Sequence, residues 1–140
     1  MGRILAIDYG TKRTGIAVTD PEKIIATALV TIPSHELLKY LEKYVAENNV
    51  ECFVVGDPKQ MNNLPSESAK AANDFVKRLQ KKFNNIPVKR MDERFTSKMA
   101  IQSIRDSGLK KSGRQNKELV DMVSATILLQ SYMESYGNKQ

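Results

Sequence analysis

Two short apolar runs joined by a polar turn open the chain, in the stretch RILAIDYGTKRTGIAVTD (residues 3–20). The first run, Ile4–Ile7, ends on a carboxylate, Asp8, and the second, Ile16–Val18, follows a turn that contains glycine. A connection this short joins antiparallel neighbours in a sheet, because parallel strands need a crossover of a dozen or more residues. A further apolar run at 26–32 extends this arrangement, so we expect a three-strand antiparallel meander.

The rest of the chain alternates between helical and strand patterns. Apolar side chains recur at helical spacing after Ser34, which is a candidate N-cap residue. The continuous apolar run Cys52–Val55 is typical of a central strand buried on both faces. The remaining expected elements are a helix at 65–83, a strand at 86–91 and helices at 96–108 and 117–136. The order β-β-β-α-β-α-β-α-α predicts an α/β fold with a mixed five-stranded sheet and helices on both faces.

Length, charge and cysteine content limit the class of protein. The 140 residues suit one domain, spanning 1–140, and the net charge of +6 favours a polyanionic partner. The lone cysteine, Cys52, excludes an internal disulfide and fits a reducing compartment. No apolar run is long enough to span a bilayer, and the N-terminus lacks the apolar segment of a signal peptide. We therefore expect a cytoplasmic protein with no membrane partner.

Acidic residues follow three of the expected strands: Asp8, Asp57 and the pair Asp92-Glu93. In mixed sheets, ligands collect at the carboxyl ends of the central strands, where these residues are expected. An aspartate after a very apolar strand is poorly explained by solubility, although aspartate is also a common turn residue. For Asp92-Glu93-Arg94, the alternative to a ligand-binding role is a solvated turn with a surface ion pair.

Asp121 lies in the largely apolar segment ELVDMVSATILLQSYM. On a helix it shares a face with small or apolar side chains, so we expect it to face the protein body. These side chains are Ser124, Ala125, Leu128 and Tyr132. An isolated charge there is costly and requires a hydrogen-bond donor, a cation or a metal. The alternative is an aspartate stabilised by the helix dipole or by a lysine.

Three carboxylates from two strand ends and one helix can converge on divalent cations. Two such ions, bridged by carboxylates, activate a water and stabilise the leaving oxygen of a phosphodiester. The glycines after Asp8 let a nucleic-acid backbone approach, and nearby basic side chains can bind its phosphates. The basic loop at 107–116 would add contacts, although both basic segments could instead be solvated turns. The expected phosphate-binding residues are Lys12, Arg13, Arg94, Lys110, Lys111 and Arg114.

Other site chemistries lack support in this sequence. The chain has no glycine-rich dinucleotide motif and no Walker A motif, and one cysteine with one histidine cannot form a zinc site. We expect His35, beside the candidate helix cap, to be structural or exposed. The Asp-Tyr-Gly-Thr segment resembles the first phosphate loop of ATPases and sugar kinases. Those folds need two lobes around the nucleotide, which 140 residues cannot supply.

Four segments occur in the order and spacing of a known family: LAIDYGTKRTGIAV, VVGDPKQMNN, VKRMDERFTS and ELVDMVSATILL. Through them the chain resembles the YqgF family, also called RuvX, over essentially its whole length. The resemblance implies a ribonuclease H-like fold, similar to that of the Holliday-junction resolvases. It also implies a nuclease that processes the 5′ end of the small-subunit ribosomal RNA precursor, pre-16S rRNA.

The same resemblance implies roles for the acidic residues. Asp8 corresponds to the first-strand metal ligand and Asp121 to the helix carboxylate. The pair Asp92-Glu93 supplies the middle carboxylate, for which we choose Glu93, leaving Asp92 as a possible extra acid. Asp57 departs from the family pattern, which usually has an uncharged residue there. It is a candidate for an extra ligand or for a residue that caps the loop.

The sequence thus predicts a two-metal-ion endonuclease, a hydrolase that uses Mg²⁺ or Mn²⁺ to cut structured RNA such as an rRNA precursor. One alternative is a resolvase of branched DNA, which would favour a dimer because it cuts two strands symmetrically. Another is a non-catalytic nucleic-acid-binding module, against which the three acids argue. The residues leave open whether the protein is a monomer or a homodimer.

Overall fold

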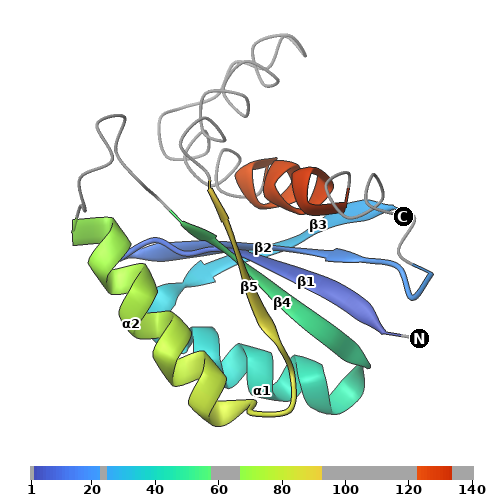
Figure 1. Ribbon diagram of the computed structural model, residues 1–140, viewed down its shortest axis with the longest axis horizontal. Helices are drawn as coiled ribbons and strands as arrows, with labels where there is room; N and C mark the ends of the chain where they lie inside the picture. Colours follow the sequence, from blue (N-terminus) through green and yellow to red (C-terminus); the bar gives the residue numbers. More distant parts are fainter. Residues whose placement is uncertain (1, 23–24, 58–66, 93–122, 134–140) are drawn as a thin grey trace, which may run out of the picture.

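The computed structural model describes residues 2–22, 25–57, 67–92 and 123–133, which form a twisted sheet with helices on either side (Figure 1). The strands are β1 (Arg3–Asp8), β2 (Arg13–Thr19), β3 (Ala26–Pro33), β4 (Val50–Asp57) and β5 (Val88–Asp92). Their order in the sheet is β3-β2-β1-β4-β5. Strand β2 is antiparallel to β1 and β3, whereas β4 and β5 run parallel to β1. The predicted mixed five-stranded sheet is confirmed.

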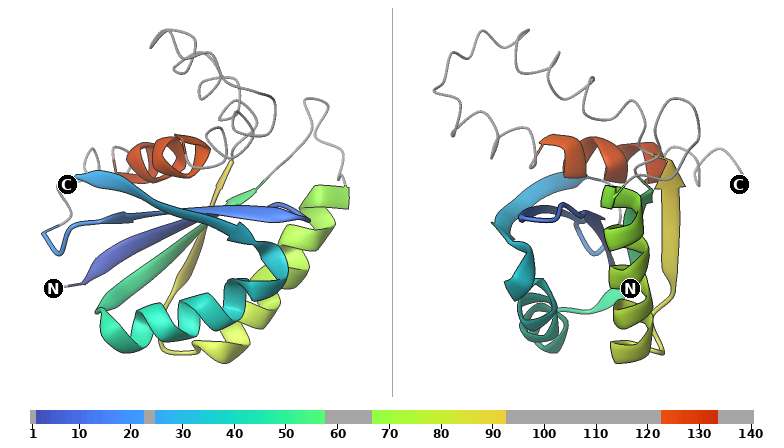
Figure 2. Two further views of the ribbon diagram at one scale, coloured as in Figure 1. Left: turned by 180° about the vertical axis from the view of Figure 1, so that it is seen from behind. Right: turned by 90° about the vertical axis from the view of Figure 1, so that its left-hand side faces the viewer.

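Helices cover both faces of this sheet. A 3-10 turn, η1 (Ser34–Glu36), leads into α1 (Leu37–Glu47), and α2 (Glu67–Lys82) joins β4 to β5. Helices α1 and α2 lie on one face, and the helical residues 123–133 lie on the other (Figure 2). None of the helices among the described residues is long and apolar enough to cross a membrane. The helix expected at 96–108 and the loop at 107–116 lie outside the described residues.

Strand β1 divides the core into two layers because successive side chains of a strand point to opposite faces. Leu5 and Ile7 belong to the layer under α1 and α2, together with the α2 residues Phe75 and Leu79. The other layer contains Ile4, Ala6, Cys52, Val54, Ala125, Leu128, Leu129 and Tyr132. Full burial of one large apolar side chain stabilises by about 1.5–3 kcal/mol, so each layer anchors its helices firmly. The expected burial of the run at 52–55 on both faces is confirmed.

Cys52 is buried in the layer beneath residues 123–133, 7% exposed. Its Sγ lies 3.8 Å from the hydroxyl oxygen of Tyr132. Burial raises the pKa of the Cys52 thiol, against smaller opposing effects of the Tyr132 hydrogen bond and the Lys89 charge. The thiol therefore acts as a small core side chain, as its apolar sequence context predicts.

The turn between β1 and β2 is tied to the start of η1. The Ser34 hydroxyl donates to the Gly10 carbonyl, and its oxygen lies 2.8 Å from Oγ1 of Thr14. The backbone N–H of Ser34 donates to the carbonyl of Lys12 at 2.9 Å. The predicted N-cap role of Ser34 is wrong, because Pro33 precedes the 3-10 turn and no side chain caps it. Ser34 instead holds the β1–β2 turn, a contact across 20 or more residues.

Gly10 is required at this turn because a Cβ there would collide with the backbone carbonyl of Arg13. We predict that Gly10→Ala lowers the free energy of unfolding by about 1–3 kcal/mol, measured by urea or thermal denaturation. Thr11→Ala, an exposed change in the same turn, is the control and should shift stability by less than about 0.5 kcal/mol. Equal stability of Gly10→Ala and the wild type would contradict this account of the turn.

Candidate active site

Asp8 is the last residue of β1, at the carboxyl end of this central strand, and it is half-buried. By the alternation of β1 it shares a face with Ile4 and Ala6, which pack under residues 123–133. Its cross-strand partner in β2 is Gly15. On the β4 side, Ile7 pairs with Val55, so the next residue along, Gly56, flanks Asp8. Because glycine has no side chain, neither neighbouring strand places one directly beside the carboxylate.

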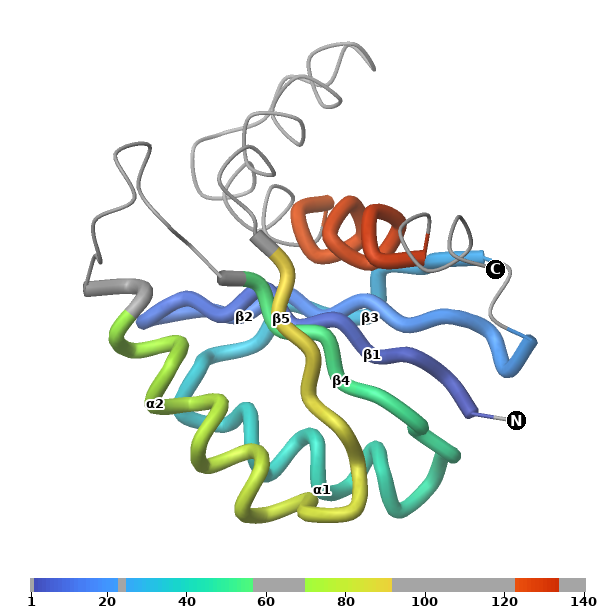
Figure 3. Tube along the Cα trace, in the orientation of Figure 1, coloured from blue at the N-terminus to red at the C-terminus, as the bar shows by residue number. Residues whose placement is uncertain are grey.

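Strands β4 and β5 run parallel to β1, so the carboxyl ends of all three lie at the same end of the sheet. Figure 3 shows β4 and β5 converging toward that end. Asp57 and Asp92 pair in register at the ends of these strands. The predicted placement of the acidic segments at carboxyl ends is therefore confirmed for Asp8, Asp57 and Asp92 as backbone positions. Met91, one residue earlier, packs against the layer under 123–133.

The structure describes only part of the predicted site. Lys12 is exposed in the β1–β2 turn, and Arg13 is half-buried at the start of β2. Among the described residues, no group of three or more acidic, histidine or cysteine side chains could hold a metal ion. Six predicted residues lie outside the described ranges: Glu93, Arg94, Lys110, Lys111, Arg114 and Asp121. The convergence of Asp8 with the other carboxylates stays a prediction.

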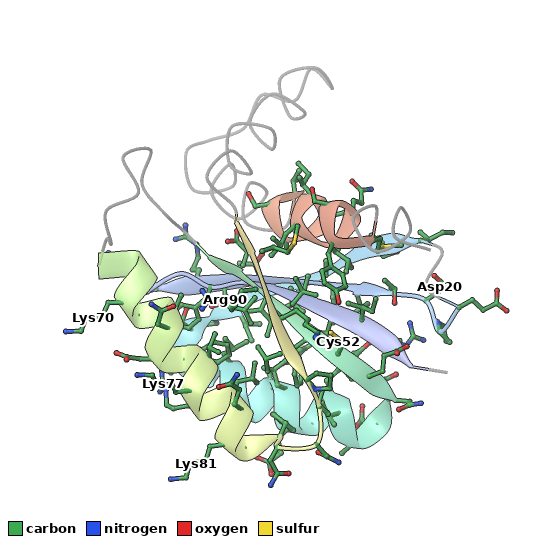
Figure 4. The ribbon with its side chains drawn as sticks, in the orientation of Figure 1. Asp20, Cys52, Lys70, Lys77, Lys81 and Arg90 are labelled. Carbon is green, nitrogen blue, oxygen red and sulfur yellow. The ribbon has the colours of Figure 1, made fainter. Side chains whose placement is uncertain are left out.

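Arg90, which sequence analysis did not single out, holds the end of β4 in place (Figure 4). Its Nε donates to the carbonyl of Val55 at 3.3 Å and its Nη2 to that of Gly56 at 3.1 Å. Its Nη1 donates to Oδ1 of Asn73 on α2 at 2.8 Å. A guanidinium can serve these acceptors at once because its donors form a rigid planar fork. Arg90 thereby joins β4, β5 and α2 beside the position of Asp8.

Ser124, at the start of the helical residues 123–133, is 1% exposed. Its hydroxyl has no hydrogen-bond partner within the part of the chain that the structure describes. A buried hydroxyl left unpaired costs about 1–3 kcal/mol, so this side chain is suited to a polar ligand or solvent molecule. It lies on the same face of the sheet as Asp8. Ser124, Ala125, Leu128 and Tyr132, which share the helical face expected for Asp121, are buried. Asp121 lies outside the described residues, so its inward orientation stays a prediction.

The fold has counterparts among solved structures. The resolvase of fowlpox virus, in a complex with Holliday junction DNA, is similar with a TM-score of 0.59 and 16% identity, over 96% of this chain and 98% of that one. RuvC of Thermus thermophilus is similar with a TM-score of 0.56 and 15% identity, over 96% of each chain. These likenesses define the class of fold, the ribonuclease H-like fold of the resolvases.

The family follows from the sequence itself. The family model described as "RuvX: Holliday junction resolvase" matches residues 2–135, and the chain belongs to this family. A relative from Phocaeicola vulgatus, named "Putative pre-16S rRNA nuclease", is 58% identical over 96% of this chain and 97% of its own length. A relative of the same name from Flavobacterium johnsoniae is 57% identical over 96% of this chain and 98% of its own. The predicted family is thereby confirmed.

We predict that Arg90→Lys destabilises the protein although the charge is kept. The ammonium of a lysine is a single group on a flexible side chain, so it cannot donate to the Val55 and Gly56 carbonyls and to Asn73 at once. One or two hydrogen bonds are therefore lost, which together contribute about 1–3 kcal/mol. Thermal denaturation measures this loss as a lower melting temperature. The control is Lys89→Gln, an exposed neighbour on β5, which should melt close to the wild type. A melting temperature of Arg90→Lys at or above that of Lys89→Gln would refute the assignment.

Proposed function

We propose that this protein is a metal-dependent nuclease that processes the 5′ end of pre-16S rRNA. The observation that carries the proposal is Asp8, a carboxylate fixed at the end of a central strand and flanked by Gly15 and Gly56. The names of its relatives, which match over nearly their full length, point to the substrate. In this proposal residues 1–140 form a single nuclease domain, and the protein acts in the cytoplasm.

The metal site would be formed by Asp8, Glu93 and Asp121. Strand alternation supports Glu93 over Asp92 as the middle carboxylate. Met91 faces the layer that Asp8 shares, and Arg90 faces α2. If this alternation continued past Asp92, position 93 would fall on the same face of the sheet as Asp8. The same parity argument counts against Asp57 as an extra ligand, since Val55 belongs to the opposite layer.

Support for Asp121 comes from the helix that follows it. The four residues that share its helical face, from Ser124 to Tyr132, are buried against the sheet. That layer is the one on the Asp8 side of the sheet. A carboxylate in helical phase with these residues would therefore face the same layer as Asp8.

The proposed donor set fits a hard divalent cation, because it consists of carboxylate oxygens. The buried hydroxyl of Ser124, which has no hydrogen-bond partner among the described residues, lies on the same side of the sheet. Nucleases of this fold generally use divalent metal ions, and we propose Mg²⁺ or Mn²⁺ here. When bound, such ions supply an activated water and stabilise the leaving oxygen. Asp8 holds its oxygens rigidly because β1 is buried on both faces. Lys12 and Arg13 neutralise flanking phosphates, and the glycines leave room for the strand that carries them.

A second candidate function is resolution of branched DNA. The description of the family model and the junction complex of the fowlpox virus protein favour it. Both functions need the same carboxylates, but a resolvase is expected to act as a homodimer, whereas the RNA nuclease could act as a monomer. Incubation of the pure protein with pre-16S rRNA and with a four-way DNA junction, each with Mg²⁺ or Mn²⁺, separates them by which substrate is cut.

We predict that Asp8→Asn abolishes cleavage while it preserves folding and binding. The change keeps the side-chain shape but removes one negative charge, so cation affinity falls and the cleavage rate drops by at least about a hundredfold. RNA affinity without divalent ions should stay equal or rise, since a charge that repels phosphate is gone. Cleavage assays, thermal melting and metal-free binding measure the three quantities.

The matched control is Asp74→Asn, the same chemical change on the exposed side of α2. It should cut at the wild-type rate. Wild-type cleavage by Asp8→Asn would defeat the catalytic assignment and favour a non-catalytic binding module. A large fall in its melting temperature would instead favour a role for Asp8 as a turn residue.

We also predict that substrate binding is largely electrostatic. Each phosphate contact contributes about 0.7–0.9 to the slope of log affinity against log salt concentration. Lys12→Gln should reduce that slope by about this amount, measured by RNA binding between low and moderate salt. Lys43→Gln, an exposed residue of α1, is the control and should leave the slope unchanged. A wild-type affinity that does not vary with salt would overturn this prediction.

A further inference from the structure

A cavity of about 250 Å³ opens at the end of β1, and the proposed chemistry does not use it. Tyr9, which lines it, follows Asp8 directly and belongs by strand alternation to the opposite face of the sheet. The cavity therefore lies on the α1 and α2 side, next to the edge where Asp8 is found. The other lining residues are Thr11, Ser34, His35, Leu38, Phe75 and Arg78.

The cavity has an aromatic wall. The ring of Tyr9 stacks on that of Phe75, with centroids 4.8 Å apart and planes inclined by 13°. Phe75 is buried and Tyr9 is half-buried, and both line the cavity. A stacked pair of rings that lines a cavity provides an aromatic surface, and every nucleobase has a π-face that can contact it.

The rim of the cavity carries polar and cationic groups. Arg78 is exposed on α2, and its guanidinium can bind a phosphate by two parallel hydrogen bonds. Thr11 and Ser34 line the turn side of the cavity, where the Ser34 hydroxyl donates to the Gly10 carbonyl. At the same rim, Oε2 of Glu36 lies 3.8 Å from Nε2 of His35. An aromatic wall beside an arginine matches a base joined to a phosphate better than it matches a purely apolar ligand.

The walls are pre-organised before any ligand binds. The hydrogen bonds of Ser34 to Gly10 and Lys12 fix the turn side relative to η1. The Tyr9–Phe75 stack fixes β1 relative to α2. A ligand would therefore not have to order the cavity, and less of its binding free energy is lost.

We propose that this cavity binds one unpaired nucleotide of the substrate, with its base against Tyr9 and its phosphate on Arg78. The inference rests on the proposed function in that the nucleotide belongs to the strand that crosses the sheet edge at Asp8. Asp8 and Tyr9 are consecutive residues whose side chains point to opposite faces, so a substrate strand that passes over the carboxyl end of β1 would contact both. The preferred RNA would then have a single-stranded extension next to its structured part.

The test compares two RNA hairpins with the same stem, one blunt and one with a single-stranded extension of several nucleotides. Binding is measured by fluorescence anisotropy without divalent ions, so that cleavage plays no part. The wild type should bind the extended hairpin more tightly. Arg78→Gln should weaken that binding by roughly tenfold and remove the preference for the extension. Lys77→Gln removes the same charge from the neighbouring exposed residue of α2, outside the lining, and should keep the preference.

The aromatic wall is tested by a second pair of variants. Tyr9→Phe keeps the ring and should keep the preference, whereas Tyr9→Leu keeps apolar bulk without the ring and should lose it. Thermal melting identifies variants that are folded. Identical effects of Arg78→Gln and Lys77→Gln on both hairpins would overturn the proposal. So would a folded Tyr9→Leu protein that still prefers the extended hairpin.

The outcome is separable from that of the proposed function. A wild type that cuts neither pre-16S rRNA nor a DNA junction, yet needs Tyr9 and Arg78 to prefer the extended hairpin, would overturn the nuclease and support the nucleotide site. A wild type that cuts pre-16S rRNA and binds both hairpins equally would support the nuclease and overturn the nucleotide site.

Discussion

The burial of β1 on both faces is the constraint on which the rest of the structure depends. Its odd-numbered apolar residues pack under α1 and α2, and its even-numbered ones pack under residues 123–133. The strand cannot slip by one residue without moving both sets to the wrong layer. The same rule sends Asp8 to one side of the sheet and Tyr9 to the other. One edge of the molecule can thereby combine a carboxylate with an aromatic cavity.

Local pattern was enough to predict the elements, because apolar periodicity reflects which side chains a strand or helix buries. The continuous run at 52–55 predicted the central strand, and the short turn after Asp8 predicted antiparallel pairing. The errors lie where distant contacts decide. Ser34 was expected to cap a helix but binds the β1–β2 turn. Strand β5 was expected to begin at Ile86 but begins at Val88, after Pro87, whose carbonyl accepts from the N–H of Phe53.

The site was predictable only in part for a similar reason. Asp8 could be selected because a carboxylate after an apolar strand is conspicuous in sequence. Arg90, Tyr9 and Arg78 could not, since their importance comes from α2 packing across the end of β1 and β4. An arginine in a short strand and a tyrosine beside a glycine carry no pattern of their own. Glu93 and Asp121 stand as predictions from sequence, supported by the faces that the strands and helix present.

The parallel pairing of β1 with β4 has a consequence for the order in which the chain folds. Strands β1, β2 and β3 are joined by short connections and can pair early, whereas Ile7 and Val55 pair across 48 positions of sequence. Until β4 arrives, one edge of β1 has unpaired N–H and C=O groups, the kind of edge that recruits other strands. Gly56 and Arg90 also reach their positions near the carboxyl end of β1, where Asp8 lies, only after this slower step. A chain still emerging from the ribosome would thus have an incomplete active site, so nuclease activity would begin only when folding is complete.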